Sequence, residues 1–197
     1  MTSFAFPDIR PQAQSWALQN FTAIFKSPLN GSISTLDRDG ESWRISMTFT
    51  NLNDARRRQL LAFLFKLNGA QHRFTVRDFA FTRGGAGGGS PLVNGGAQTG
   101  KNLIIDNGPN SQTNWLLAGD QIGVAGLLHS VDANVSTDGS GNATIIVSPR
   151  IFLSPNNNAA VEIDQPTNSF VLDVESINVV TRPPALSSVS FAGQSSL

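Results

Sequence analysis

Cysteine is absent from this chain of 197 residues, and histidine occurs only twice. The absence of cysteine excludes disulfides and thiolate metal sites, so packing and hydrogen bonding alone must hold the fold together. His72 and His129 are distant in the sequence, and no serine stands in a Gly-x-Ser-x-Gly elbow that would position a catalytic triad. We therefore expect no enzyme activity, no catalytic residues and no cofactor.

Long hydrophobic runs are also missing. No stretch approaches the roughly 20 apolar residues of a membrane-spanning helix. The first ten residues, MTSFAFPDIR, lack the basic flank and apolar run of a secretory signal. We therefore expect a soluble protein that is made in the cytoplasm and has no membrane partner.

Two segments come close to ligand-binding motifs and fail on particular positions. Residues 95–101 fit GxxxxGK, but Asn102 replaces the hydroxyl that binds magnesium, and the following residues have the pattern of a strand instead of a helix. Residues 132–138 resemble a calcium loop, but Thr137 replaces its essential glycine. We expect no nucleotide and no metal site, with calcium at the Asp138 turn as the lesser alternative.

Alternation of apolar and polar residues dominates the first half of the chain. Residues 43–50 alternate strictly and place four apolar side chains on one face: Trp43, Ile45, Met47 and Phe49. Residues 14–25 alternate too, but their apolar face changes parity around Asn20, as it does at a β-bulge. The segment SPLNGS, residues 27–32, predicts a turn, and DRDG, residues 37–40, predicts a second hairpin.

One segment, residues 53–68, has the periodicity of a helix. Asn51 or Asn53 can cap its N-terminus, Gly69 follows its last turn, and an apolar stripe runs between them through Leu60, Leu64 and Leu67. A further strand is expected over residues 71–78.

Three consecutive arginines, Arg56, Arg57 and Arg58, lie in the first turns of this helix. The helix dipole disfavours cations there by a few tenths of a kcal/mol each. We expect all three to be exposed, either as a solvated face or as a contact with an anionic partner.

The glycine-rich run at residues 84–90 predicts a flexible linker and a domain boundary. Residues 84–167 consist of short strands and turns, including a hairpin of residues 129–135 with 143–147, and predict a small β-barrel or sandwich. Residues 1–83 form the first domain, and a strand within 168–184 is expected to return and complete its sheet. Residues 185–197 are expected to form a flexible tail.

Charge is unevenly distributed although the formal net charge is zero. Up to Arg83 the chain has 11 Lys and Arg against 6 Asp and Glu, and after Arg83 it has 3 against 8. Without clustered lysines and interleaved aromatics this is a weak footprint for nucleic-acid binding, and electrostatic complementarity between neighbouring copies explains it at least as well.

The order of these elements resembles that of the distal tail proteins of long-tailed bacteriophages, which are ring-forming adaptors between tail tube and tail tip. The first half carries the likeness in FKSPLNGS (residues 25–32), GESW (40–43), the helix up to Gly69, and FTVRD (74–78). The second half carries it in AGDQI (118–122), Val131, DGSGNATI (138–145) and SPR (148–150).

This resemblance implies a fold that is mainly β with one helix: a tube-like split β-barrel domain plus a second β-rich domain. It implies a homo-oligomer, a ring of six copies in the virion, stacked between the tail tube protein and the tip or baseplate hub. DNA would pass through the channel of this ring without specific binding.

A carbohydrate- or receptor-binding β-module of the tail tip is the alternative, because small barrels and sandwiches often bind sugars. Trp115 is the candidate ligand platform because it follows a polar stretch, residues 110–114. An exposed Trp115 would favour this alternative.

Overall fold

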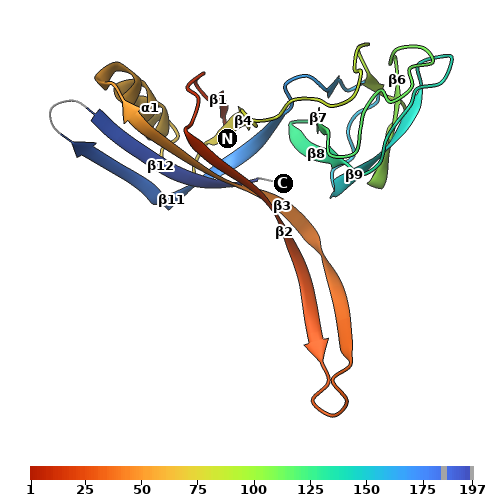
Figure 1. Cartoon of the computed structure of the whole chain (residues 1–197), viewed down its shortest axis with the longest axis horizontal. Coiled ribbons are helices and arrows are strands. Elements are labelled where there is room, and N and C mark those ends of the chain that lie inside the picture. The colour runs from red at the N-terminus through yellow and green to blue at the C-terminus, as the bar shows by residue number, and fades with distance from the viewer. Residues whose placement is uncertain (183–185, 196–197) are drawn as a thin grey trace.

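The computed structural model describes residues 1–182 and 186–195, and this part of the chain is mainly β with a single α-helix (Figure 1). Its elements are β1 (Ser3–Ala5), β2 (Ala13–Lys26), β3 (Ile33–Leu52), α1 (Asp54–Lys66), β4 (Arg73–Arg77), β5 (Leu92–Val93), β6 (Gly100–Asp106), β7 (Gln121–Val124), β8 (Leu127–Val131), β9 (Ala143–Ile151), β10 (Val161–Glu162), β11 (Thr167–Arg182) and β12 (Leu186–Ser195). They form two six-stranded sheets, each with a hydrophobic core of its own.

The first sheet has the order β1-β4-β11-β12-β3-β2 and combines strands from both ends of the chain. β11 pairs antiparallel with β4 and with β12, and β12 pairs antiparallel with β3. The predicted flexible tail is therefore wrong for residues 186–195, which form an inner strand with Val189 and Phe191 buried. Residue 185 and residues 196–197 lie outside the described residues.

The expected hairpin at residues 37–40 is also wrong, because β3 runs without interruption through it. Gln19 pairs with Ser42 and Phe21 with Arg38, so residues 39–41 of β3 face Asn20 alone. This register shift confirms the predicted bulge around Asn20. Residues 39 and 40 of the DRDG segment, which predicted a turn, lie on the β3 side of this bulge. Gly40 accommodates the extra length with a φ of 121°, in a region that favours glycine.

The predicted helix is confirmed as α1. The Asn53 side chain caps it by accepting a hydrogen bond from the Arg56 backbone N–H at 2.9 Å. The predicted stripe of Leu60, Leu64 and Leu67 is buried in the core of the first sheet. There it packs with the apolar face of β3. Ile45, Met47 and Phe49 on this face are fully buried, as the alternation predicted.

The second sheet has the order β10-β7-β8-β9-β6-β5, and its two edges meet. Leu92 of β5 forms a β-bridge with Ala160, which directly precedes β10, and the Val93 N–H donates to the Ala159 carbonyl at 2.9 Å. This sheet therefore closes almost completely into a small barrel, as expected. The two sheets lie side by side (Figure 1).

The predicted barrel hairpin forms only in part. Val131 of β8 pairs with Val147 of β9, but Val135 leaves β8 and forms a bridge with Leu116. The beginning of β9 pairs instead with β6, where Ala143 lies opposite Ile105.

Residues 84–90 are docked against the barrel, so the expectation of a flexible linker is wrong. The backbone N–H groups of Gly84 and Gly85 donate to the two carboxylate oxygens of Asp120 at 2.7 and 3.0 Å. A Cβ atom on Gly85 would lie 2.4 Å from the Trp115 carbonyl oxygen. Glycine is therefore required there for close approach of two backbones.

Direct hydrogen bonds also connect the barrel with the first sheet. The Trp43 indole N–H donates to the Leu128 carbonyl at 2.8 Å, and the Leu128 N–H donates to the Asn168 side-chain oxygen at 3.1 Å. Within residues 1–182 and 186–195, α1 is too short and polar to cross a membrane, and no other helix is present.

Candidate assembly surface

The outer part of the β2–β3 hairpin extends away from both sheets as a two-stranded ribbon (Figure 1). We call residues 20–38 the arm. Residues 27–32 form its turn, which is closed by a hydrogen bond from the Ser27 N–H to the Ser32 carbonyl at 2.8 Å. The Asn30 side chain accepts the Ser32 N–H at 3.0 Å, and Gly31 has a positive φ of 69°. The tip is therefore built as the sequence SPLNGS predicts.

Apolar side chains occupy both faces of the arm. Because Phe25 pairs with Ser34 and Ala23 pairs with Leu36, Phe21, Phe25 and Leu36 share one face. Ile24 and Ile33 lie on the opposite face. These side chains and Leu29 at the tip are strongly exposed: Phe21 47%, Leu36 52%, Phe25 58%, Ile33 66%, Ile24 69% and Leu29 96%.

A two-stranded ribbon has no layer behind it, so it cannot bury either face within one copy of the chain. Phe21 is the least exposed of the six because it lies over Gly40, where a Cβ atom would be 3.7 Å from its ring. A contiguous exposed apolar surface of this kind is typical of a protein–protein interface. The arm is therefore the strongest functional feature of the molecule.

The arginine triplet of α1 is divided between two environments. Arg57 and Arg58 both form ion pairs with Asp54 at 2.6 Å. The hydrogen bond from Arg57, and the positive charge of Arg58, lower the pKa of Asp54. Arg56 and Arg58 are exposed as expected, but Arg57 is half-buried. Contact with an anionic partner stays a prediction.

Arg56 lines a cavity of about 470 Å³ between the start of α1, the segment before β2, and β4. Its lining consists of Asp8, Ile9, Arg10, Pro11, Gln12, Arg56 and Arg77. Asp8 is 3.4 Å from Arg77, and no carboxylate of the described residues forms an ion pair with Arg10 or Arg56. We call this the arginine cavity.

Trp115 is fully buried in the barrel core, so its interpretation as a ligand platform is wrong. Its indole N–H donates to the Gly88 carbonyl at 3.1 Å, which fastens residues 84–90 to the barrel. The polar residues before it form the surrounding loop, and the aromatic ring turns inward. The other aromatic residue between positions 84 and 166, Phe152, is half-buried.

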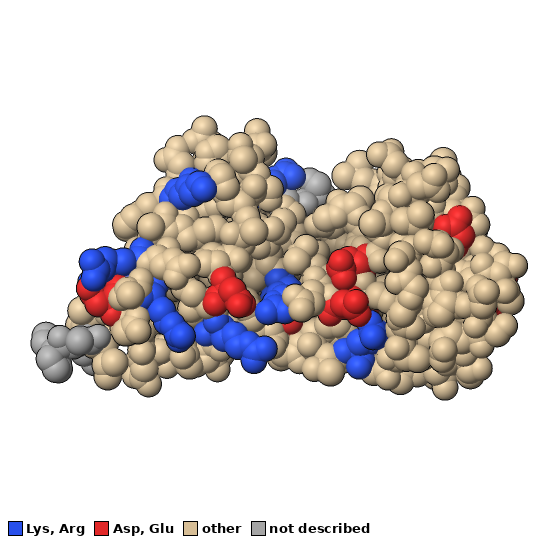
Figure 2. All heavy atoms as spheres, turned by 90° about the horizontal axis from the view of Figure 1, so that it is seen from above, with Lys and Arg blue, Asp and Glu red and all other residues tan. Residues whose placement is uncertain are grey.

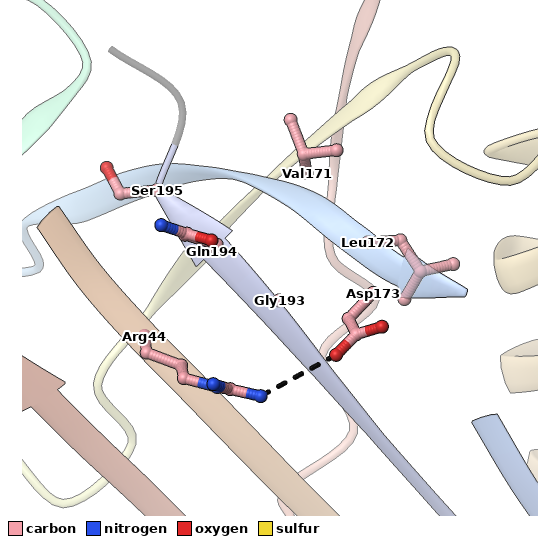
Figure 3. A pocket seen from close by; sticks show the side chains of 7 residues that line it. All are labelled: Arg44, Val171, Leu172, Asp173, Gly193, Gln194 and Ser195. Atoms are coloured by element: carbon pink, nitrogen blue, oxygen red, sulfur yellow. Dashed lines mark ion pairs between the residues drawn. The ribbon is translucent and has the colours of Figure 1, made fainter. Parts of the chain in front are cut away.

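A cavity of about 500 Å³ lies at the end of β12, beside Arg44 of β3 and residues 171–173 of β11 (Figure 3). It contains an ion pair between Arg44 and Asp173 at 3.6 Å, both half-exposed. Ser195 is the one hydroxyl residue in its lining, and the lining has no histidine or lysine to act as a base. Its one carboxylate, that of Asp173, is held in the ion pair with Arg44.

The two histidines also lack a catalytic setting. His129 is buried, and its burial lowers the pKa of the imidazole. Its Nδ1 atom lies 2.7 Å from the Pro149 carbonyl oxygen, within the contact between barrel and first sheet. His72 packs edge-on against Phe4 with ring centroids 5.6 Å apart.

The motif-like segments have ordinary structural roles. Gly100 and Lys101 begin strand β6, so no helix follows the GxxxxGK pattern. Asp138 closes a turn by accepting the Ser140 and Asn142 N–H groups at 2.8 Å each, and these hydrogen bonds lower its pKa. Among the described residues, no three His, Cys, Asp or Glu side chains are grouped closely enough to hold a metal ion.

No protein-family model matches this sequence, and no curated protein matches it.

Proposed function

We propose that this chain is a structural protein of a bacteriophage tail, and that its copies close into a ring that joins the tail tube to the tail tip or baseplate hub. The observation that carries the proposal is the arm, whose apolar side chains are exposed on both faces. A surface of this kind requires a partner, and a ring-forming protein supplies one in every neighbouring copy.

The edges of the first sheet support the same proposal. β2 and β1 are its outermost strands, and within the described residues no further strand pairs with either. An exposed edge offers backbone N–H and carbonyl groups to another chain without any specialised side chain. β2 continues directly into the arm, so an edge contact and an apolar contact are available on one strand.

The surfaces of the arm and of the opposite sheet edge are different, so a contact in which the arm of one copy meets that edge of the next is heterologous. Such contacts close into a ring if the rotation between copies is suitable and otherwise produce filaments. The resemblance to distal tail proteins supplies the remaining parts of the proposal: six copies, the tail tube protein and hub as neighbours, DNA in the channel, and a place in the virion after assembly in the host cytoplasm.

The alternative of a carbohydrate- or receptor-binding module is weaker. An exposed Trp115 would favour it, but Trp115 is buried. No aromatic side chain of the described barrel residues is fully exposed. Sugar-binding sites usually use such a ring as a stacking platform.

The test compares the oligomeric state of the full chain with that of an arm variant. Native mass spectrometry and negative-stain imaging of the unaltered chain are expected to show closed rings. The variant carries Ile24→Ser, Phe25→Ser and Ile33→Ser, and we expect folded monomers because no core contact is removed. Leu153→Ser is the matched control, because Leu153 is 62% exposed in the barrel and should not affect assembly.

A second measurement addresses localisation. Peptides of this chain should be found by mass spectrometry in purified phage particles. An unaltered chain that stays monomeric over a wide range of concentration and salt, and is missing from the particles, would contradict the proposal.

A further inference from the structure

We propose that the arginine cavity receives carboxylate side chains from the barrel of a second copy of this chain. This inference rests on the proposed function, because it names a specific contact between neighbouring copies. It also gives a role to Arg56, the one member of the arginine triplet that lines the cavity.

The cavity has a surplus of positive charge. Three guanidinium groups, those of Arg10, Arg56 and Arg77, line it together with one carboxylate, that of Asp8. The distance of 3.4 Å between Asp8 and Arg77 is longer than the ~2.7–2.9 Å of a strong charge-assisted hydrogen bond. Asp8 is also strongly exposed, with 85% of its side chain accessible. It therefore neutralises the three arginines poorly.

The other two arginines of the triplet are neutralised within α1, unlike Arg56. Asp54 forms ion pairs with Arg57 and Arg58, and it is the acidic residue of the first helical turn. The helix could have neutralised Arg56 in the same way but provides no carboxylate for it. Arg56 thus keeps its hydrogen-bond donors available on the cavity side.

The chemistry of the lining identifies the kind of ligand. A guanidinium group presents donors in a planar fork that matches the two oxygens of a carboxylate, and several such groups can bind one acidic side chain. Binding would also relieve the mutual repulsion of the three cations. The cavity volume of about 470 Å³ is large enough for an aspartate or glutamate side chain from another molecule.

The barrel of a second copy is the partner with complementary charge. Residues 84–166 have 2 Lys and Arg against 6 Asp and Glu, whereas residues 1–83 and 167–197 together have 12 against 8. On the face shown in Figure 2, the basic side chains gather mainly over the half that contains the first sheet. The ion pair of Asp164 with Arg83 is the one formed by a barrel carboxylate within the described chain.

Three barrel carboxylates are available at the surface for this contact. Asp132 and Glu162 are exposed and Asp106 is half-buried, and none of the three forms an ion pair within the described residues. A contact from the barrel of one copy to the cavity of the next is heterologous, which is the type a ring requires.

The experiment is a charge exchange in the full chain, read as the concentration at which oligomers dissociate. Arg56→Glu is compared with Arg58→Glu, a substitution two positions away on the same helix that changes the charge equally but lies outside the cavity lining. We expect Arg56→Glu to raise the dissociation concentration about tenfold or more, the usual effect of losing one well-formed charge contact, and Arg58→Glu to change it much less. The effect should diminish at high salt.

The decisive variant carries Arg10→Glu and Arg56→Glu, which change the formal charge of the cavity lining from +2 to −2, together with Asp106→Lys, Asp132→Lys and Glu162→Lys in one chain. If the cavity binds the barrel of the next copy, the reversed charges attract again and assembly is recovered. Equal dissociation of the Arg56→Glu and Arg58→Glu variants, in a chain that does assemble, would overturn this inference and leave the proposed function intact. A failure of the unaltered chain to assemble would instead contradict the proposed function itself.

A short DNA duplex serves as the probe for a phosphate ligand. Three arginines in one cavity do not form the extended basic stripe that follows a nucleic-acid backbone, so we expect weak duplex binding that Arg56→Glu leaves unchanged. Duplex binding that is lost on Arg56→Glu while assembly is unchanged would assign the cavity to a nucleic acid and overturn the proposal.

Discussion

Replacing Gly85 by alanine should detach residues 84–90 from the barrel. The added Cβ atom would lie 2.4 Å from the Trp115 carbonyl oxygen and 2.6 Å from the Leu116 Cα atom. Both atoms belong to the backbone, so neither can move aside by changing a side-chain rotamer. The cost should therefore exceed that of ordinary overpacking, which is about 1–3 kcal/mol.

The consequences extend to two sets of hydrogen bonds. Moving Gly85 away lengthens the N–H contacts of Gly84 and Gly85 with Asp120 and the contact from the Trp115 indole to Gly88. A buried carboxylate that loses donors adds a desolvation cost of about 1–3 kcal/mol. We expect a total loss of about 3 kcal/mol or more in the free energy of unfolding of the barrel.

Urea denaturation followed by tryptophan fluorescence measures this loss, because Trp115 is buried at the affected contact. Gly96→Ala is the matched control: nothing lies within 4 Å of its added Cβ atom, and Gly96 has no positive φ. The control should change stability by less than about 0.5 kcal/mol. If Gly85→Ala is as stable as the control, the close backbone approach is not what holds this segment, and the reasoning is refuted.

Three further predictions follow from single contacts. Asp120→Ala should lower stability by about 2–4 kcal/mol in urea denaturation, because the Gly84, Gly85 and Leu117 N–H groups all lose their acceptor; an effect no larger than that of Asp106→Ala would contradict this. His129 has a lowered folded-state pKa because it is buried, so the unfolded chain binds the proton more readily and stability should fall as the pH drops below about 6.5. His129→Gln should flatten that pH profile, and an unchanged slope would exclude His129 as its cause. Phe25→Ser should leave the thermal unfolding midpoint of the monomer unchanged, since its ring is 58% exposed, and a large decrease would place it in an internal contact.

The strongly periodic segments could be predicted from the sequence. The helix at α1 has both a cap residue and a buried stripe, and β3 around Met47 alternates strictly. For such segments one local pattern satisfies the backbone and buries the apolar face, so local and tertiary preferences agree.

The errors arose where tertiary contacts decide the outcome. Residues 186–195 contain many serines and look like a tail, but alternate burial of Val189 and Phe191 between β11 and β3 makes them a strand. The DRDG segment reads as a turn, but the long pairing of β2 with β3 converts it into a bulge. Both outcomes depend on pairing with other strands, which the pattern within the segment itself does not report.

The candidate site could be anticipated only in part for a related reason. Trp115 and Phe25 both stand near polar residues in the sequence, but one is buried in the barrel and the other is exposed on the arm. Local polarity does not distinguish a loop that wraps a core from a ribbon without a second layer. The arginine triplet could be predicted as a charge cluster. That Arg57 and Arg58 pair with Asp54, whereas Arg56 lines the cavity, depends on helix geometry and on the segment around Arg10.

The arm and the arginine cavity should contribute to assembly in different ways. Burying the arm's exposed apolar side chains is worth about 1.5–3 kcal/mol each for full burial, and this gain is not directional and depends little on ionic strength. The charged contact adds orientation and association rate, and it weakens as salt screens it. As the salt concentration rises, the difference in dissociation concentration between the Arg56→Glu and Arg58→Glu variants should therefore disappear first, while oligomers persist. Loss of the arm should abolish oligomers at every salt concentration, because a charge pair alone is too weak to hold two copies together.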